Sequence, residues 1–381
     1  MILEIIFWIL LVVLGLPAAY MLVFSVASKF YRPRKEKPAT AQRRYVILVP
    51  AYKSDAFIRA TALAARGQDY PADKYRVLVI ADSMKDESLD PLPGLGVEVL
   101  KVSLERSSKA ASLRKAMEWL GPDVADEVVI LDSDNIIAPD FLSKADALVE
   151  GGTVAIQAHR TAKNLDTPVA VLDAATEEIN NAIFRAGHCA LGISSALIGS
   201  GIVLPYDWFA HTAQTLDTSA EDKELELALL HQGIFVDYAP DIPVLDEKTR
   251  TAANYQGQRR RWQASNFFMM SQALGELGTA KDKVGYFDKI FQWCLPSRMI
   301  VLAGLPVFAI IATILGLSTL WAWWGAFAAL LLALLLGLPR SLMGGKLLRA
   351  MVKVPQLALI NVLNLFHLKG TKHTYIHTEH Q

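Results

Sequence analysis

Two aspartates stand one residue apart in Asp132-Ser133-Asp134, directly after an apolar run that ends at Leu131. A turn at the end of a buried strand can present both carboxylates to one cation, and Mg²⁺ and Mn²⁺ both favour oxygen ligands. An Asp-x-Asp pair in a loop also commonly caps a helix, so the spacing alone does not establish a metal site. We predict that Asp132 and Asp134 bind a divalent metal, because a diphosphate would lie at this edge of the predicted sheet.

Two further polar residues are expected near the same edge. Asp82 follows another apolar run and could accept hydrogen bonds from a nucleobase or a ribose, although a solvated turn would suit it equally well. Lys109 lies near the start of a predicted helix, where an ammonium group and backbone N–H groups can together stabilise phosphate charge. An ordinary surface lysine is the alternative for this residue.

A cluster of carboxylates follows Ser219 and consists of Glu221, Asp222 and Glu224. Ser219 can cap a helix with an acidic first turn, which is ordinary helix-start chemistry. Asp222 could also accept the proton of an attacking hydroxyl, a role that needs an ionised carboxylate within hydrogen-bond reach. We therefore predict that Asp222 is a general base.

The segment Gln258-Arg259-Arg260-Arg261-Trp262 places an amide, guanidinium groups and an indole within little more than one helical turn. Arginine suits a diphosphate, and tryptophan offers a stacking face to a sugar or a base. A basic patch on an interfacial helix would also explain three arginines. The flanking Gln258 and Trp262 favour the first interpretation.

These groups require a sheet whose strands end at one edge. Between Arg43 and about Gln263, short β-rich runs alternate with helical stretches, which is typical of an α/β fold with a mostly parallel sheet. Ligands of such sheets bind beyond the carboxyl ends of the strands. The predicted strands are Tyr45–Val49, Arg76–Ile80, Val97–Leu100 and Glu127–Leu131, and the predicted helices include Ser54–Arg66 and Ser108–Leu120.

Composition excludes some classes of protein. The 38 basic and 38 acidic residues cancel, so no overall field would attract nucleic acid. The two cysteines cannot form a disulfide framework, which fits a catalytic part that faces a reducing cytosol. Hydrophobic residues make up 52% of the 381-residue chain, more than a soluble domain usually carries, so part of the chain is expected to lie in a membrane.

Apolar stretches that could cross a membrane lie near both ends of the chain. Ile2–Ala27 is long enough to span about 30 Å of hydrocarbon, and the basic cluster that follows it argues against a cleaved signal peptide. The positive-inside rule places the N-terminus outside and the following residues in the cytoplasm. Met299–Leu320 and Trp321–Leu338 predict a hairpin, whereas Val354–Phe366 is shorter and predicts an interfacial helix or a plain core helix.

We therefore expect a multi-pass protein of the inner (plasma) membrane whose catalytic domain lies in the cytoplasm. The tail histidines, from His367 to His380, follow no metal-ligand spacing, so a polar tail that could fold back over the site is expected. The expected divisions are a transmembrane helix over 1–28, a basic cytoplasmic linker over 29–42, a catalytic domain over 43–265, interfacial helices over 266–298, a transmembrane hairpin over 299–340, and an amphipathic segment with a cytoplasmic tail over 341–381.

Taken together, the motifs resemble family 2 glycosyltransferases with the GT-A fold, a Rossmann-like α/β fold with a mostly parallel sheet. The resemblance runs from Tyr45 to Trp262 and is strongest to the membrane-bound branch with cellulose, hyaluronan and chitin synthases and ceramide glucosyltransferase. Each landmark is loose alone, but the set is specific in this order. The landmarks are Val49-Pro50-Ala51-Tyr52, Asp82, Lys109, Asp132-Ser133-Asp134, Gly199-Ser200-Gly201, Glu221-Asp222, and Gln258 with Arg261-Trp262.

The resemblance implies an inverting hexosyltransferase that uses Mg²⁺ or Mn²⁺ and moves a sugar from a nucleotide sugar, expected to be a UDP-sugar, to a glycan or lipid acceptor. Asp222 would be the catalytic base, Asp132 and Asp134 would bind the metal, and Gly199-Ser200-Gly201 would line the acceptor path. Lys53 and Ser54 depart from the Asn-Glu of many members, so donor binding is expected to differ in detail. The implied nucleotide-sugar-binding residues are Pro50, Ala51, Tyr52, Asp82, Lys109, Asp132, Gln258, Arg261 and Trp262.

The product is less constrained than the chemistry. Three predicted spans are few for a polymer channel, so synthesis of an exopolysaccharide or envelope glycan would call for helper subunits. We favour that pathway, and transfer of a single sugar to a lipid is the alternative. A nucleotide-sugar binding protein or a nucleotidyltransferase could use the same sheet edge, but it would not need Asp222 or the motif from Gln258 to Trp262.

Overall fold

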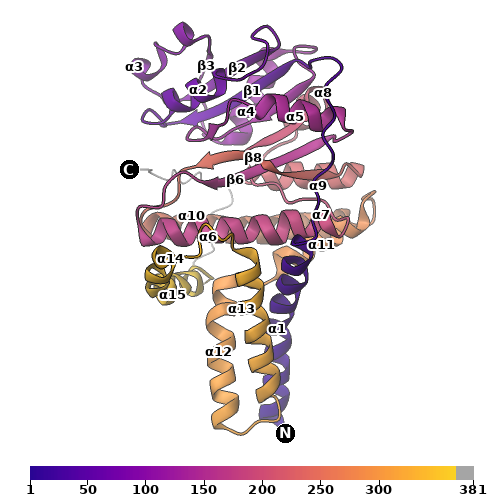
Figure 1. Cartoon of the computed structure of the whole chain (residues 1–381), viewed down its shortest axis with the longest axis vertical. Coiled ribbons are helices and arrows are strands. Elements are labelled where there is room, and N and C mark those ends of the chain that lie inside the picture. Colours follow the sequence, from indigo (N-terminus) through magenta and orange to yellow (C-terminus); the bar gives the residue numbers. More distant parts are fainter. Residues whose placement is uncertain (366–381) are drawn as a thin grey trace.

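An α/β domain stands on a bundle of long apolar helices in this computed structural model (Figure 1). The structure describes residues 1–365, except for the side chains of residues 260, 261, 264, 267 and 365. An eight-stranded sheet runs in the order β3-β2-β1-β4-β7-β6-β8-β5. Its strands are β1 (Tyr45–Tyr52), β2 (Tyr75–Asp82), β3 (Glu98–Val102), β4 (Glu127–Ile130), β5 (Ile136–Ile137), β6 (Ala155–Ala162), β7 (Ile202–Pro205) and β8 (Val236–Asp246).

The first four strands are parallel to one another, which confirms the predicted mostly parallel sheet. β7 is antiparallel to both β4 and β6, β6 is parallel to β8, and β5 is antiparallel to β8. The sheet is therefore mixed beyond β4. The carboxyl ends of β1, β2 and β4 meet at one edge, because the three strands are neighbours and run the same way.

Alternate residues of β1 belong to two different hydrophobic cores. Ile47 and Val49 pack with α2 and α5 on one face of the sheet. Val46 and Leu48 pack with α4, α8 and α9 on the other. Because both faces are covered, polar side chains of the parallel strands can reach a ligand only at the strand ends.

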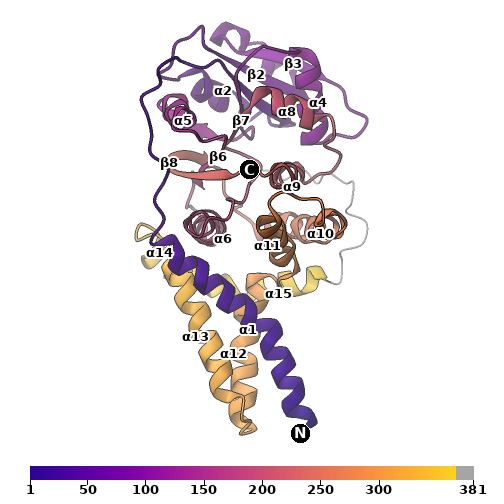
Figure 2. The same cartoon turned by 90° about the vertical axis from the view of Figure 1, so that its right-hand side faces the viewer.

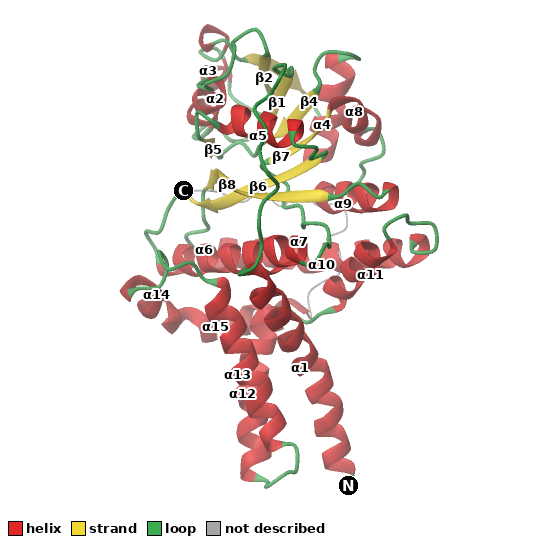
Figure 3. Cartoon of the chain, turned by 45° about the vertical axis from the view of Figure 1, so that its right-hand side comes forward, coloured by secondary structure: helices red, strands yellow, loops and turns green. Residues whose placement is uncertain are grey.

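The helices form two groups, one around the sheet and one below it. Figure 3 shows the strands above a layer of helices that includes α6, α10 and α11. Those that belong to the domain and this layer are α2 (Ile58–Arg66), α3 (Asp86–Leu89), α4 (Lys109–Leu120), α5 (Phe141–Glu150), α6 (Pro168–Asn180), a π-helical segment (Asn181–Gly187), α7 (His188–Ala190), α8 (Tyr206–Ala213), α9 (Glu221–Gln232), α10 (Ala252–Glu276) and α11 (Lys283–Cys294). The remaining helices are α1 (Ile2–Ser28), α12 (Arg298–Ile314), α13 (Leu320–Gly337), α14 (Gly345–Ala350) and α15 (Val354–Leu365).

The apolar helices α1, α12 and α13 pack together and extend away from the sheet (Figure 2). By length and composition, α1 and α13 can each cross a membrane, and α11 with α12 meets the same test only as a pair bent by 60°. α12 and α13 run side by side, as expected for the predicted hairpin (Figure 1). α15 packs against both α10 and α12. Asn361 of α15 donates a hydrogen bond to the Tyr255 hydroxyl of α10 at 3.3 Å.

A close backbone contact joins α1 to the π-helical segment. A Cβ atom added to Gly187 would lie 2.2 Å from the carbonyl oxygen of Phe24, so no larger side chain fits without moving the backbone. We expect Gly187→Ala to destabilise the protein by about 1–3 kcal/mol, the usual cost of overpacking. Thermal unfolding of the purified protein in detergent measures the effect.

Gly275→Ala is the matched control for this prediction. Gly275 also lies in a helix, but an added Cβ would meet nothing within 4 Å. Alanine has the higher helix propensity, so the control should unfold at the same or a slightly higher temperature. Equal melting temperatures for Gly187→Ala and the unaltered protein would contradict the tight contact.

Candidate functional site

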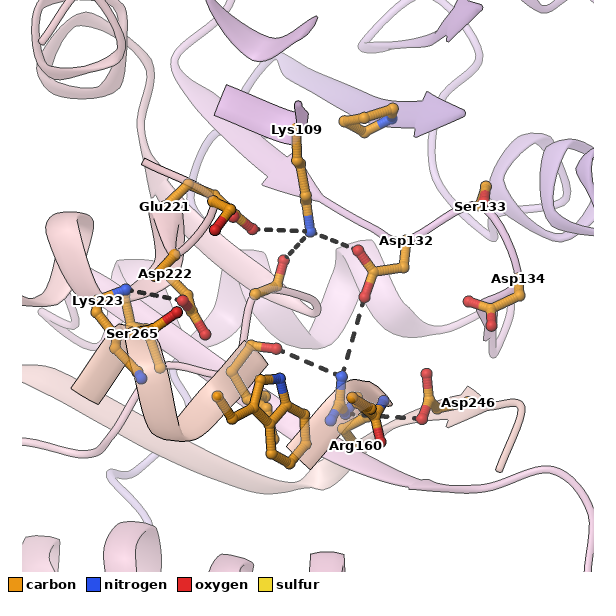
Figure 4. Close-up of a pocket in the computed structure, with 18 of the residues that line it drawn as sticks. Lys109, Asp132, Ser133, Asp134, Arg160, Glu221, Asp222, Lys223, Asp246 and Ser265 are labelled. Carbon is orange, nitrogen blue, oxygen red and sulfur yellow. Dashed lines mark hydrogen bonds and ion pairs between the residues drawn. The ribbon is translucent and has the colours of Figure 1, made fainter. Parts of the chain in front are cut away.

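A cavity of about 780 Å³ opens at the carboxyl ends of β1, β2 and β4 (Figure 4). It brings together side chains that are far apart in the sequence, as the motifs predicted. The lining residues from those motifs are Pro50, Ala51, Tyr52, Asp82, Lys109, Asp132, Asp134, Gly199, Asp222, Gln258 and Trp262.

One end of the cavity lies away from the helix layer. The residues that end β1 and β2 form it. Asp82 is 2% exposed and its Oδ1 accepts a hydrogen bond from the Ser83 hydroxyl at 3.0 Å. Its Oδ2 has no hydrogen-bond partner within the described part of the chain. Lys53 and Ser83 leave the two strands in the left-handed region, with φ of 50° and 54°. A buried acceptor of this kind suits an N–H or O–H group of a ligand.

Lys109 connects the end of β4 with the start of α9. Its ammonium group donates to Asp132 and to the carbonyl oxygen of Gly199, and it lies 3.5 Å from Glu221 (Figure 4). Burial disfavours the charged form, but Asp132 and Glu221 outweigh this effect and raise the pKa of Lys109. Lys109 therefore stays protonated and holds these groups together.

The backbone of the Asp132-Ser133-Asp134 turn is held by two buried side chains. The Asp132 N–H donates to Asn135 Oδ1 at 3.1 Å and to the Ser200 hydroxyl at 3.0 Å. Asn135 in turn donates from Nδ2 to Asp134 and to Asp246, each at 3.2 Å. The conformation of the turn is thus set by groups that the ligand itself need not touch.

Asp134 carries an unfavourable concentration of negative charge. Burial, followed by the nearby Asp246 and Asp132, raises the pKa of Asp134 well above its usual value. A divalent cation would relieve this repulsion, and carboxylate oxygens are the ligands that Mg²⁺ and Mn²⁺ favour. Among the described residues no group of three or more His, Cys, Asp or Glu side chains is assembled for a metal, so water and phosphate oxygens of a donor would complete the coordination.

Arg160 is a site residue that the motifs did not single out. Its guanidinium group pairs with Glu177 at 3.0 Å and lies 3.9 Å from Asp132 and 3.9 Å from Asp246. Arg160 and its neighbour His159 both lie on β6. Only Arg160 lines the cavity, because successive strand residues point to opposite faces and His159 pairs instead with Tyr238 and Glu178.

Asp222 lies in the first turn of α9 and faces the cavity (Figure 4). Its Oδ1 accepts the N–H of Lys223 at 2.9 Å, which fixes the carboxylate at the helix start. The preceding Glu221 is buried, and burial with the charge of Asp222, opposed by Lys109, raises the pKa of Glu221 to about 7. Asp222 is placed to accept a proton from a group in the cavity.

The predicted capping role of Ser219 is wrong. Ala220 occupies the N-cap position of α9, without a side-chain hydrogen bond. The loop before the helix is held by Glu224, whose carboxylate accepts the N–H groups of Asp217 and Thr218 at 3.0 and 2.7 Å. A carboxylate one turn into the helix therefore holds the preceding loop, and no side chain caps α9.

Of Gly199-Ser200-Gly201, only Gly199 lines the cavity. Gly199 has φ of 75°, and a Cβ there would lie 3.8 Å from Asp222 Oδ2. Ser200 is fully buried behind the turn at Asp132, and a Cβ on Gly201 would lie 2.9 Å from Val244. Ser200 and Gly201 therefore lie behind the cavity wall and support it. Only Gly199 remains a proposed acceptor contact.

The Gln258–Trp262 motif lies on α10 beside the cavity. Gln258 Oε1 is buried without a hydrogen-bond partner in the described structure, and Trp262 stacks under the Arg259 guanidinium at 4.5 Å. Arg259 also pairs with Asp173 at 3.1 Å, so it does not reach into the cavity as a free cation. Arg261 lies on the same helix, but its side chain falls outside the described residues.

The model of the family described as "Glycosyltransferase like family 2" matches residues 42–265, more than half of the chain. The chain belongs to glycosyltransferase family 2. It is 24% identical over 295 residues to an N-acetylglucosaminyltransferase of Rhizobium leguminosarum bv. viciae, a match that covers 73% of this chain and 67% of that protein. It is 23% identical over 235 residues to the UDP-forming cellulose synthase catalytic subunit of Pseudomonas fluorescens (strain SBW25), covering 57% of this chain but only 30% of the synthase.

A solved structure extends the likeness to nearly the whole glycosyltransferase chain. The mannosyltransferase PcManGT from Pyrobaculum calidifontis, in complex with GDP-Man and Mn²⁺, superposes with a TM-score of 0.61 at 18% identity. The match covers 96% of this chain and 99% of that one. The expected GT-A fold is thereby confirmed. As a member of glycosyltransferase family 2, the present chain uses a nucleotide sugar as donor.

Proposed function

We propose that this glycosyltransferase moves a sugar from a UDP-sugar to an acceptor hydroxyl, with inversion, in the synthesis of an exopolysaccharide or envelope glycan. The observation that carries the proposal is that Asp132 and Asp222 face one cavity, in which Lys109 binds Asp132 and lies 3.5 Å from Glu221, the residue before Asp222. Donor and acceptor groups can therefore meet between them. A protein that only binds nucleotide sugars would need the first aspartate but not the second.

The step follows from the position of the two aspartates. The acceptor oxygen forms a bond to the anomeric carbon as its proton passes to the Asp222 carboxylate, and the carbon–oxygen bond to the diphosphate breaks with its electron pair. Lys109 and Arg160 contribute positive charge at the diphosphate side. A Mg²⁺ or Mn²⁺ ion held by Asp132 and Asp134 would supply Lewis-acid stabilisation of the leaving group.

The donor assignment rests on two kinds of support. The end of the cavity at Ala51, Tyr52 and Asp82 offers an unpaired buried acceptor to a nucleobase or ribose. One of the curated relatives is named as UDP-forming, whereas the superposed mannosyltransferase holds GDP-Man. We propose a uridine nucleotide as donor because the sequence resemblance and the UDP-forming relative agree on it.

We further propose that α1, α12 and α13 cross the inner membrane and that the catalytic part faces the cytoplasm. Basic residues follow α1, and Arg298, Arg340 and Lys346 flank the hairpin on the same side. Nucleotide sugars are cytoplasmic substrates in this arrangement. Helper subunits would be needed if the product is a polymer that crosses the bilayer, because three helices are few for a channel.

The proposal is tested with the purified full chain in nanodiscs, Mn²⁺, and a panel of UDP-sugars with GDP-mannose as comparison. We expect one UDP-sugar to be hydrolysed slowly without acceptor, releasing UDP, and to be consumed faster when membrane extract supplies an acceptor. Preference for GDP-mannose would overturn the uridine assignment. Binding of a nucleotide sugar with no hydrolysis and no transfer would favour a binding protein.

A further inference from the structure

The cavity does not end at Asp222 but continues to the helix layer next to the apolar bundle. Phe184, Gln292 and Trp293 line this lower end. Phe184 belongs to the π-helical segment and also packs against the cluster formed by α1, α12 and α13. One aromatic side chain thus borders both the reaction cavity and the helices proposed to lie in the membrane.

α11 separates the lower end of the cavity from the outside. One face of this helix lines the cavity and another is exposed. Gln292 and Trp293 line the cavity, whereas Val284 and Phe287 are 68% and 60% exposed. The Phe291 ring packs at a tilt of 51° against Tyr20 of α1, with ring centroids 5.2 Å apart. In Figure 2, α11 lies at the level where α1 leaves the bundle. This wall of the cavity therefore stands at the expected membrane surface.

Hydrogen bonds fix that wall to α1. Gln292 Nε2 lies 3.1 Å from His188 Nε2, and the fully buried His188 ring stacks on Phe24 of α1 at 3.8 Å. The Tyr20 hydroxyl of the same helix donates to Asp288 of α11 at 2.7 Å. Because the hydrogen bonds and the ring stack are directional, the cavity end keeps one height relative to α1 and hence to the bilayer.

The groups at this end suit a polar headgroup that carries hydroxyls. Phe184 and Trp293 offer aromatic faces, and Gln292 and Asn266 offer amides. The neighbouring cation Arg185 is already paired with Glu177 at 3.2 Å. A second cation of the cavity wall, Lys223, donates a hydrogen bond to Asn266 Oδ1. A hydroxylated headgroup can stack and hydrogen-bond here, and a hydrocarbon tail attached to it would continue into the bilayer.

We propose that the acceptor is an amphiphilic lipid with a hydroxylated headgroup, which enters from the membrane side past Phe184 and Trp293 and presents a hydroxyl to Asp222. The inference rests on the proposed function and names its acceptor class. The bond changes are those given above: the lipid hydroxyl loses its proton to Asp222, its oxygen bonds to the anomeric carbon, and UDP departs with the electron pair of the broken bond. A lipid-borne glycan and a single-sugar glycolipid both fit this acceptor class.

The test compares methyl, octyl and dodecyl glucosides as acceptors for the full chain in nanodiscs, with the radiolabelled UDP-sugar that the donor panel identifies. We expect kcat/KM to rise at least about tenfold from the methyl to the dodecyl compound, since each buried CH₂ contributes about 0.8 kcal/mol. Labelled product should partition into butanol. Equal kcat/KM for the three acceptors would overturn the lipid assignment while leaving transferase activity in place.

Two phenylalanine variants locate the entrance. Phe184→Ala should lower kcat/KM about fivefold or more for dodecyl glucoside and less for methyl glucoside, which has no chain to pass the ring. Phe287→Ala removes an exposed ring from the outer face of α11 and should change neither rate by more than about twofold. Equal effects of the two variants would contradict entry past Phe184. If UDP release is absent even in the unaltered protein, the proposed function fails and the acceptor assignment fails with it.

Discussion

Replacing Asp222 with asparagine is expected to lower sugar transfer by about 10³-fold, the middle of the usual range for general-base catalysis. Asparagine keeps the side-chain oxygen that accepts the Lys223 N–H at 2.9 Å, so the start of α9 should stay in place. It cannot take a proton from the acceptor. Donor binding should change little, because the donor end at Asp82 and Asp132 is untouched. Initial rates of transfer and calorimetric titration with the UDP-sugar measure the two effects separately.

Asp217→Asn is the matched control for this variant. Asp217 lies in the loop just before α9, but its side chain is exposed and does not line the cavity. The control should keep its rate within about twofold of the unaltered protein. If Asp222→Asn retained full transfer, Asp222 would be removed from the mechanism. Glu221, whose pKa is raised to about 7, would then be the next carboxylate to consider.

The parallel half of the sheet could be predicted from the sequence because its strands are continuous apolar runs. Tyr45–Val49 and Glu127–Leu131 were expected as strands, and β1 and β4 occupy those positions with both faces covered. The second half follows less directly. β6 and β8 mix polar and apolar residues, and β6 pairs with both β7 and β8, which are distant from it in the chain. No local periodicity specifies such a pairing.

The candidate site divides in the same way. Asp82, Asp132 and Asp222 follow strands or begin a helix, so a simple rule about sheet edges brings them together, and all three line one cavity. Arg160 and Asp246 could not be found by that rule. Asn135 reaches Asp246 across 111 residues, and only the folded sheet places that carboxylate beside the turn. Long-range hydrogen bonds of this kind carry no local sequence signal.

The metal assignment leads to a second large expected effect, the loss of donor binding in Asp134→Ala. Asp134 is 8% exposed, and its pKa is raised well above the usual value by burial, Asp246 and Asp132. We expect donor affinity in the presence of Mn²⁺ to fall at least about 100-fold, because removal of one carboxylate ligand weakens both the metal and the diphosphate bound to it. Donor titrations with Mn²⁺ and with EDTA measure this loss, and transfer should be abolished in parallel.

Asp140→Ala provides the control, since Asp140 lies a few residues further along, forms an exposed pair with Lys144 and is absent from the cavity wall. It should bind donor as the unaltered protein does. The residual binding of Asp134→Ala distinguishes two arrangements. If Arg160 and Lys109 bear most of the diphosphate charge, Asp134→Ala will keep a weak affinity that EDTA does not change. If Mn²⁺ dependence itself persists in that variant, Asp134 is not a metal ligand, and the raised pKa of its carboxyl reflects only burial and the neighbouring Asp246 and Asp132.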